Sequence, residues 1–112
     1  MEDEPIAYTV LLTQDAMDDL EAIYDYIYIH DLPDRADYVI GRIEETFGRL
    51  TLFPERGGYL PELLEVGIKE YRETFFKPYR IIYRILDCKV YVMMIVDGRR
   101  DLQTLLLRRL LK

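Results

Sequence analysis

Two arginines inside a predicted β-strand are the residues of this chain with the clearest chemical potential. Reading every second residue of FFKPYRIIYRI (75–85) places Arg80 and Arg84 on one face of the strand. The opposite face is apolar and holds Tyr79, Ile81, Tyr83 and Ile85. Because a guanidinium group binds phosphate or carboxylate through paired hydrogen bonds, the arginine face indicates either internal ion pairs, a solvated surface or an anion-binding site.

Further arginines lie close to this strand in the sequence. Arg72 lies in the preceding predicted strand, and the segment VDGRRD carries Arg99 and Arg100 where the last strand leaves the sheet. A charged arginine is rarely buried without a partner, so the strand arginines could pair with Glu70, Glu73 or Asp97. Arg100 could pair with Asp97 or Asp101. For the three strand arginines together we favour a surface that contacts another molecule, with Arg72 close to the Arg84 end.

The amino-acid types that are missing exclude several classes of enzyme. The chain has no serine, one histidine, His30, and one cysteine, Cys88. A Ser-His-Asp hydrolase is therefore excluded, and a zinc site lacks most of its usual ligands. The glycines match neither dinucleotide- nor mononucleotide-binding motifs. We expect no metal and no cofactor.

Charge divides the chain into two chemically different halves. Residues 1–66 hold 16 acids and 4 bases, a net of −12, whereas residues 67–112 hold 5 acids and 11 bases, a net of +6; together they give the formal −6. This division predicts one acidic and one basic surface. No apolar run is long enough to cross a membrane, the first residues are acidic, and a single cysteine fits a reducing compartment; we expect a cytoplasmic protein.

The elements that must position these arginines follow from periodicity. We expect a loose tail over 1–6 and one domain over 7–112. A short strand over 7–12 precedes a helix capped by Thr13, and Pro33 suits the first turn of a second helix that ends before Pro54. The segment 54–63 is rich in proline and glycine and predicts turns.

Beyond these turns the period changes from 3.6 to 2. It predicts strands over 68–76, 79–86 and 90–96, joined by links short enough for antiparallel hairpins, and a last helix after Asp101. The predicted fold class is α+β, with a helical hairpin packed on a small, mostly antiparallel sheet in the order β-α-α-β-β-β-α.

The chain resembles toxins of the RelE/ParE superfamily from bacterial type II toxin–antitoxin modules. The resemblance covers nearly all of residues 7–111. It is carried by the segments TQDAMDDLEAIYDYI, LTLFPERG, YRETFFKPYRIIYRI and IVDGRRDLQTLLLRRLL. It implies the same fold, a helical hairpin against a small antiparallel sheet with a C-terminal helix.

The resemblance also implies one of two activities. The RelE-like branch cleaves messenger RNA on the ribosome without metal, and Arg72, Arg80 and Arg100 stand at its arginine and lysine positions. Thr74 stands at its second lysine position and Leu106 at the position of its proton-carrying tyrosine. The ParE-like branch inhibits DNA gyrase by protein contact and does not need those groups.

Because a missing proton carrier costs about 10²- to 10⁴-fold in rate, and the acidic chain is poorly suited to gripping RNA, we favour the ParE-like branch. Tyr71, Tyr79, Tyr83 or Tyr91 could still replace the missing tyrosine. The resemblance implies a cognate antitoxin as partner, with DNA contacted only through it. We expect Arg72, Arg80, Arg84, Arg99 and Arg100 to bind the target or the antitoxin. A RelE-like ribonuclease and a degenerate toxin remain the alternatives.

Overall fold

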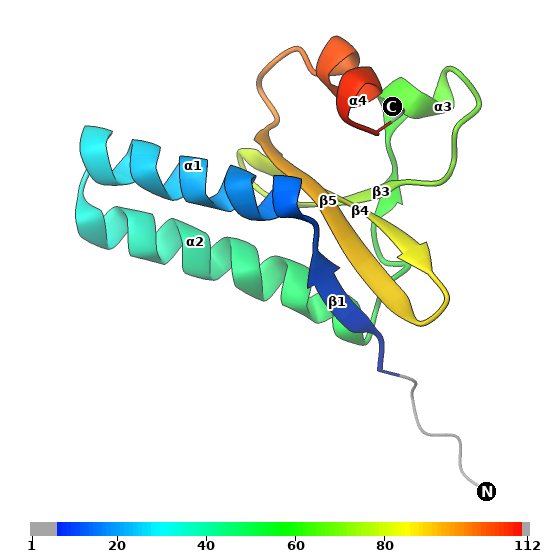
Figure 1. Ribbon diagram of the computed structural model, residues 1–112, viewed down its shortest axis with the longest axis horizontal. Coiled ribbons are helices and arrows are strands. Elements are labelled where there is room, and N and C mark those ends of the chain that lie inside the picture. The colour runs from blue at the N-terminus through cyan, green and yellow to red at the C-terminus, as the bar shows by residue number, and fades with distance from the viewer. Residues whose placement is uncertain (1–6, 111–112) are drawn as a thin grey trace, which may run out of the picture.

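The computed structural model describes residues 7–110, in which one mixed sheet is covered on both faces by helices (Figure 1). The strands are β1 (Thr9–Leu12), β2 (Gly58–Tyr59), β3 (Arg72–Phe76), β4 (Tyr79–Leu86) and β5 (Lys89–Asp97). The helices are α1 (Gln14–His30), α2 (Pro33–Gly48), α3 (Pro61–Leu64) and α4 (Gln103–Leu110), with a 3-10 turn over Arg49–Thr51. No described helix is long and apolar enough to span a membrane.

The sheet has the strand order β1-β5-β4-β3-β2. Strand β1 pairs with β5 in parallel, and every other neighbouring pair is antiparallel. The β4–β5 register shifts between Ile82 and Tyr83, which indicates a β-bulge. The turn between these two strands contains Asp87 in a left-handed backbone conformation, with φ 56°.

Helices α1 and α2 form the predicted hairpin and cover one face of the sheet. The Thr13 side chain accepts a hydrogen bond from the Ala16 N–H at the start of α1. Pro33 occupies the first turn of α2, where a missing N–H costs nothing. Their buried side chains pack with those of the sheet in one core cluster; it contains Ala16, Ile27, Ala36, Val39, Ile43, Ile81, Val92 and Ile95.

The opposite face of the sheet is covered by α3 and α4, which lie together above the strands in Figure 1. A second core cluster joins them to the sheet and contains Leu60, Leu63, Tyr71, Ile82, Met94, Val96, Leu102, Leu106 and Leu110. This is the face on which Arg80 and Ile82 lie. The alternative that this face is open to solvent at Arg80 is therefore wrong, because helices α3 and α4 cover the face.

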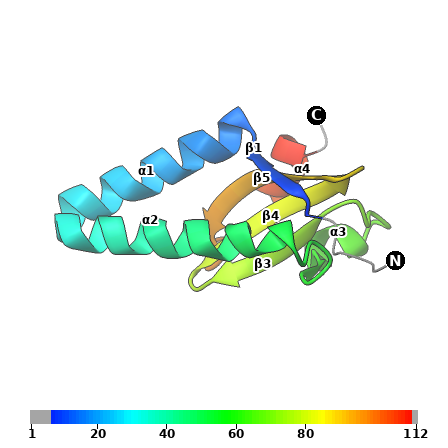
Figure 2. The ribbon, with the colours of Figure 1, turned by 90° about the horizontal axis from the view of Figure 1, so that it is seen from below.

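Seen from below, the helical hairpin is longer than the sheet that supports it (Figure 2). The loop between α1 and α2 extends past the end of the strands, so the far part of the hairpin has no sheet beneath it. Near the sheet the hairpin packs mainly through α1 on β5 and α2 on β3. The hairpin therefore has a supported half and a projecting half.

The predicted helices and the three consecutive strands are confirmed, with shifts at their ends. The strand expected from residue 68 begins at Arg72, and the one expected over 90–96 extends by one residue in each direction. The segment read as turns also contains β2 and the short helix α3. The predicted tail over residues 1–6 and the last two residues of the chain lie outside the described residues.

Candidate functional site

Arg80 is buried and held by two carboxylates. Its side chain leaves β4 under α3, where its Nη1 and Nη2 donate to the two carboxylate oxygens of Glu62 at 2.7 and 2.8 Å. Its Nε donates to Glu73 on the neighbouring strand at 2.7 Å. Only 8% of Arg80 is exposed. The expectation that Arg80 presents a free guanidinium group on a contact face is corrected by this geometry, although Glu73 was among its predicted partners.

The two carboxylates around Arg80 respond in opposite directions. The hydrogen bonds from Arg80 hold the pKa of Glu62 below its ordinary value of 4.5. Burial raises the pKa of Glu73 above that value, in spite of the same guanidinium group. Together they raise the pKa of Arg80 further above the usual arginine range, mainly through the hydrogen bonds to Glu62. Arg80 is therefore charged, and each of its three guanidinium nitrogens donates to a carboxylate.

Arg72 lies on the opposite face of the sheet from Arg80. It is paired in register with Tyr83, whereas Arg80 is paired with Phe75, and alternate residues of a strand point to opposite faces. Arg72 Nη1 donates to the carbonyl oxygens of Glu55 and Gly57, and Nη2 donates to the Tyr59 hydroxyl. Its guanidinium lies 4.5 Å from the Tyr59 ring centroid. Arg72 therefore fixes the loop before β2.

Arg84 lies half-buried near the end of the central strand β4, where it is paired with Tyr91 of β5. Its guanidinium lies 5.6 Å from the centre of the Tyr71 ring, and the Glu70 carboxylate is 3.9 Å away. Arg72 and Arg84 both line a hollow of about 320 Å³ near this end of β4. The prediction that Arg72 lies near the Arg84 end of the sheet is confirmed. The prediction of one exposed surface formed by Arg72, Arg80 and Arg84 is wrong, because the strand register places Arg72 on the opposite face of the sheet from Arg80.

Arg99 and Arg100 lie in the link between β5 and α4. Arg99 forms a two-pronged pair with Asp97, with Nε–Oδ1 and Nη2–Oδ2 distances of 2.9 and 2.6 Å. This pair holds the pKa of Asp97 below its ordinary value. A salt bridge from Arg100 to Asp97 or Asp101 was one alternative, but it is the Arg100 backbone N–H that contacts the Asp97 carbonyl oxygen. The exposed Arg100 side chain forms no ion pair within residues 7–110.

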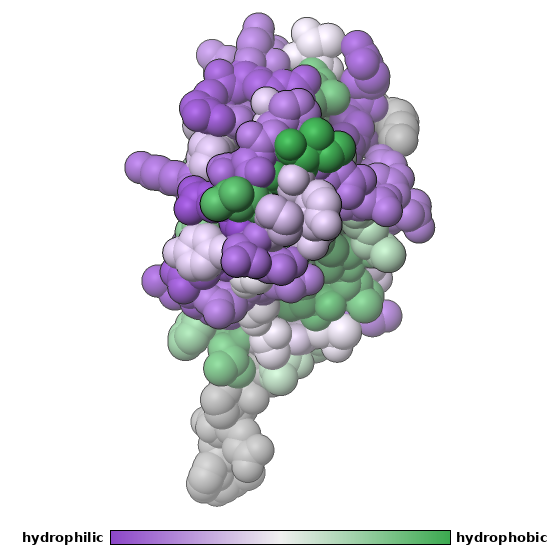
Figure 3. Space-filling model, turned by 90° about the vertical axis from the view of Figure 1, so that its left-hand side faces the viewer, coloured by the Kyte–Doolittle hydropathy of each residue, from purple (hydrophilic) through white to green (hydrophobic). Residues whose placement is uncertain are grey.

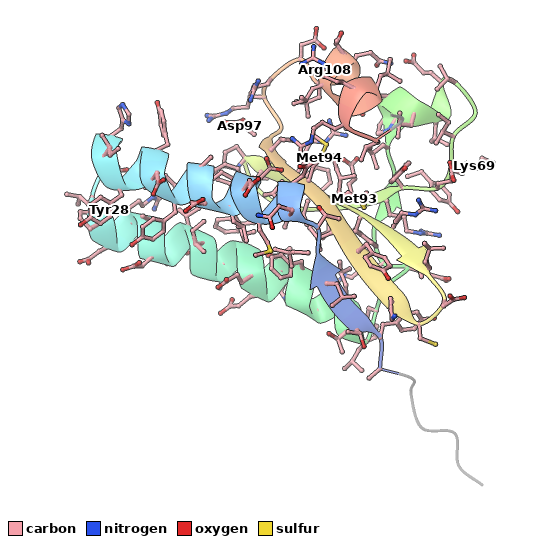
Figure 4. All side chains as sticks on the ribbon, viewed as in Figure 1. Tyr28, Lys69, Met93, Met94, Asp97 and Arg108 are labelled. Carbon is pink, nitrogen blue, oxygen red and sulfur yellow. The ribbon has the colours of Figure 1, made fainter. Side chains whose placement is uncertain are left out.

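A groove of about 530 Å³ runs beside Arg99 and Arg100, between α1, the end of β5 and α4. Figure 4 labels Asp97 at one end of this region, where β5 passes into the link to α4. Apolar side chains line it from all three elements, namely Ile23, Ile27, Ile95, Val96 and Leu105. Tyr79 contributes from β4, and burial raises the pKa of its phenol, so Tyr79 stays protonated and is unsuited to accept a proton.

Arg109 and Asp19 complete this groove and were missed by sequence reasoning. Arg109 Nη2 donates to Asp19 Oδ2 at 3.0 Å, and its Nε lies 3.4 Å from Asp15 Oδ2. Asp19 also accepts a hydrogen bond from the Ile95 N–H, at the edge of β5 beyond the end of β1. The pair therefore ties α4, α1 and β5 together. No local pattern links residues 90 positions apart.

Arg80 and Leu106, at two of the positions that correspond to RelE-branch catalytic groups, serve the fold here, whereas Arg100 at a third is exposed. Leu106 is fully buried against Ile82 and Met94. Of the tyrosines considered as replacements, the Tyr71 hydroxyl donates to the Leu110 carbonyl oxygen, and that of Tyr83 donates to the Pro54 carbonyl oxygen. Both hydroxyls are buried and used internally. No group of three metal-binding side chains occurs among the residues that the structure describes.

Comparison with known proteins agrees with this fold. A family model described as the ParE toxin of the type II toxin–antitoxin system parDE matches residues 10–102. The chain is 28% identical over 93 residues to Toxin ParE3 from Caulobacter vibrioides, covering 83% of this chain and 89% of that protein.

Two solved structures have the same fold. A chain of the chromosomal ParDE toxin–antitoxin system from P. aeruginosa superimposes with a TM-score of 0.68 at 20% identity, covering 81% of this chain and 96% of that one. A chain of the RelBE2 toxin–antitoxin complex from Mycobacterium tuberculosis gives 0.57 at 28% identity, covering 86% and 97%.

The fold and the sequence likeness define a toxin of the RelE/ParE superfamily from type II toxin–antitoxin systems. Within that superfamily, the chain belongs to the ParE toxin family, whose sequence pattern covers most of its length.

Proposed function

We propose that this toxin inhibits DNA gyrase by direct protein contact in the cytoplasm and is neutralised by a cognate antitoxin. One observation carries the proposal. Two of the positions that the resemblance assigns to RNA cleavage hold side chains committed to the fold: Arg80 is enclosed between Glu62 and Glu73, and Leu106 lies in the core. The match to the ParE family favours the same branch.

The energetics of Arg80 support a structural role rather than a catalytic one. To bind a phosphate, Arg80 would have to leave two carboxylates, and breaking a buried ion pair costs about 3–5 kcal/mol. No phenol or imidazole stands at Leu106 to carry a proton, which lowers a metal-free cleavage rate by about 10²- to 10⁴-fold. A toxin that works by binding alone has neither requirement.

The groove beside Arg99, Arg100 and Arg109 is the surface that best fits an antitoxin segment. Apolar side chains line it together with these three arginines. Arg99 and Arg109 are paired with Asp97 and Asp19, so Arg100 is the arginine best able to bind an acidic amphipathic peptide. Arg72 and Arg84 form a second, smaller basic hollow at the other end of β4. Contact with DNA would then come only through the antitoxin.

A supercoiling assay with purified gyrase tests this proposal. We expect micromolar toxin to inhibit supercoiling and equimolar antitoxin to restore it. Arg100→Glu should weaken antitoxin binding and leave inhibition intact, because this exposed side chain supports no described contact of the fold. Cleavage of messages on purified ribosomes, without any effect on gyrase, would reject the proposal.

A RelE-like endoribonuclease is the second candidate, because Arg72, Arg80 and Arg100 are retained and the chain is 28% identical to a RelBE2 chain. It predicts immediate translation arrest in cells, whereas gyrase inhibition predicts DNA breaks and filamentation. A degenerate toxin that only binds an antitoxin would leave growth unchanged. The order in which these effects appear after induction separates the three.

A further inference from the structure

The projecting end of the α1–α2 hairpin carries a cluster of exposed apolar side chains, of which Tyr26 also lines the groove described above. We call this cluster the hairpin tip; its members, with their exposed fractions, are Tyr26 (64%), Tyr28 (50%), Ile29 (73%), Leu32 (65%) and Tyr38 (53%). Figure 3 views the molecule from this end and shows apolar residues surrounded by hydrophilic ones. Large apolar groups gathered in this way commonly mark an interaction site.

Packing within the hairpin does not explain these side chains. The buried residues of this region, Ile27, Ala36 and Val39, already join the two helices to the core. The rings of Tyr26 and His30 stack with centroids 4.3 Å apart, and those of Tyr24 and Tyr28 stack at 5.8 Å. These contacts order the rings while leaving their outer faces exposed, so the hairpin tip is pre-arranged for contact.

The hairpin tip is strongly acidic. Residues 21–38 contain five carboxylates and one arginine, a formal charge of −4, with carboxylates at Glu21, Asp25, Asp31, Asp34 and Asp37. Asp37 accepts a hydrogen bond from the Tyr24 hydroxyl at 3.0 Å. The other four are exposed, and none forms an ion pair within the described part of the chain. A surface of this kind attracts a basic partner and repels an acidic one.

We propose that the hairpin tip is the surface through which the toxin docks on its inhibited target, inserting Ile29 and Leu32 into an apolar depression bordered by lysines and arginines. This inference rests on the proposed function, a toxin that acts by protein contact. It assigns target and antitoxin to different side chains, because Ile29 and Leu32 do not line the arginine-rimmed groove, which follows α1 only as far as Ile27.

Charge argues against the other occupants. An antitoxin segment acidic enough to enter the groove beside Arg99 and Arg100 would be repelled by the tip. A second copy of this toxin would bring two tips of formal charge −4 together, which is unfavourable for an isologous contact. A basic, folded protein surface satisfies both the apolar centre and the acidic rim.

Titration of gyrase with a variant of the full-length toxin tests the docking surface. In Ile29→Ala/Leu32→Ala, both side chains are more than half exposed, so the fold should be retained. We expect at least a tenfold rise in the toxin concentration for half-inhibition of supercoiling and in the dissociation constant for gyrase, with unchanged affinity for the antitoxin. Phe53→Ala/Val66→Ala is the matched control, because both residues are also more than half exposed but lie far from the tip in the chain, and it should behave as wild type.

The acidic rim is tested separately through the association rate. Asp25→Asn/Asp31→Asn should slow association with gyrase and make it less dependent on salt, whereas Glu44→Gln/Glu65→Gln should not. Equal inhibition by the tip variant and wild type would overturn the inference while leaving gyrase inhibition standing. The inference would also be overturned if Ile29→Ala/Leu32→Ala lowered the affinity for the antitoxin. Loss of a concentration-dependent toxin dimer in this variant would overturn it too, because the tip would then bind a second copy of the toxin. Wild-type toxin that does not bind gyrase would overturn both the inference and the proposed function.

Discussion

Arg80 and Glu62 form a fork-to-fork ion pair that joins β4 to α3, with Nη1–Oε2 and Nη2–Oε1 distances of 2.7 and 2.8 Å. Helix α3 contains only four residues, too few to be stable by itself. Its attachment depends on this pair together with the apolar side chains Leu60 and Leu63 below it. The ion pair therefore determines where one of the two covers of the sheet is placed.

Removing the arginine should be strongly destabilising. Arg80→Met leaves the buried Glu73 carboxylate without its cation, and we expect a loss of about 3–5 kcal/mol in the free energy of unfolding. Urea denaturation followed by circular dichroism measures it. Arg84→Met is the matched control; its partner Glu70 is 3.9 Å away and largely exposed, so a loss under about 1 kcal/mol is expected. Equal losses would contradict the structural role assigned to Arg80.

The two partners of Arg80 should affect acid stability in opposite ways. Because hydrogen bonds from Arg80 lower the pKa of Glu62, its ionised form stabilises the fold fully above pH 4.5, and this contribution is lost as the pH falls through the lowered folded pKa. Burial raises the pKa of Glu73, so its contribution grows more favourable as the pH falls from the raised folded pKa toward the unfolded one.

Glu62→Gln should therefore flatten the loss of stability below pH 4.5. Glu73→Gln should abolish the gain in stability that Glu73 gives as the pH falls from its raised folded pKa to 4.5. Urea midpoints measured at a series of pH values for wild type and the two variants provide the comparison. Three parallel curves would show that neither carboxylate has a different pKa in the folded and unfolded chain.

Leu106 should behave as a core residue. Leu106→Ala removes a fully buried side chain from the cluster under α4, and we expect a loss of about 2–5 kcal/mol. The adjacent Leu107 is 38% exposed, and its replacement by alanine should cost less than about 1 kcal/mol. Thermal unfolding of the pair separates them. Similar small effects at both positions would argue that α4 is not packed as described.

Gly57 and Gly58 should differ in their tolerance of a methyl group. A Cβ at Gly57 would overlap with the Glu73 carbonyl oxygen and approach the Tyr83 hydroxyl, whereas none of the surroundings of Gly58 lies within 4 Å. The Gly57 N–H donates to that same hydroxyl at 3.1 Å. We expect Gly57→Ala to cost about 3 kcal/mol and Gly58→Ala less than about 1 kcal/mol, measured by urea denaturation. Equal costs would rule out the close approach.

Much of the fold follows from local pattern. Thr13 and Pro33 mark the starts of α1 and α2, and the change from a period of 3.6 to a period of 2 identifies β3, β4 and β5. These signals are strong because each element repeats its apolar positions several times. The parallel pairing of β1 with β5 is not encoded locally and follows only from the completed sheet.

The environment of the arginines could not be predicted, because their partners are distant in sequence. Glu62 lies 18 residues before Arg80 in a segment rich in proline and glycine, where a helix of one turn leaves no periodic signal. Arg109 and Asp19 are 90 residues apart. The alternation of residues in β4 predicted correctly that Arg80 and Arg84 share a face. The sequence pattern did not indicate that α3 and α4 cover this face.

The pairing of Thr9 with Lys89 has a consequence for how the chain is made. The first strand has no neighbour until the last strand has been synthesised, and β5 is also the strand on which α1 packs. A nascent chain that has reached only residue 50 therefore holds both long helices with their apolar stripes uncovered. Because β1 pairs with β5 only late in synthesis, folding is slow and apolar surface stays accessible to chaperones. Truncated translation products of this protein should therefore be degraded rather than accumulate as native-like fragments.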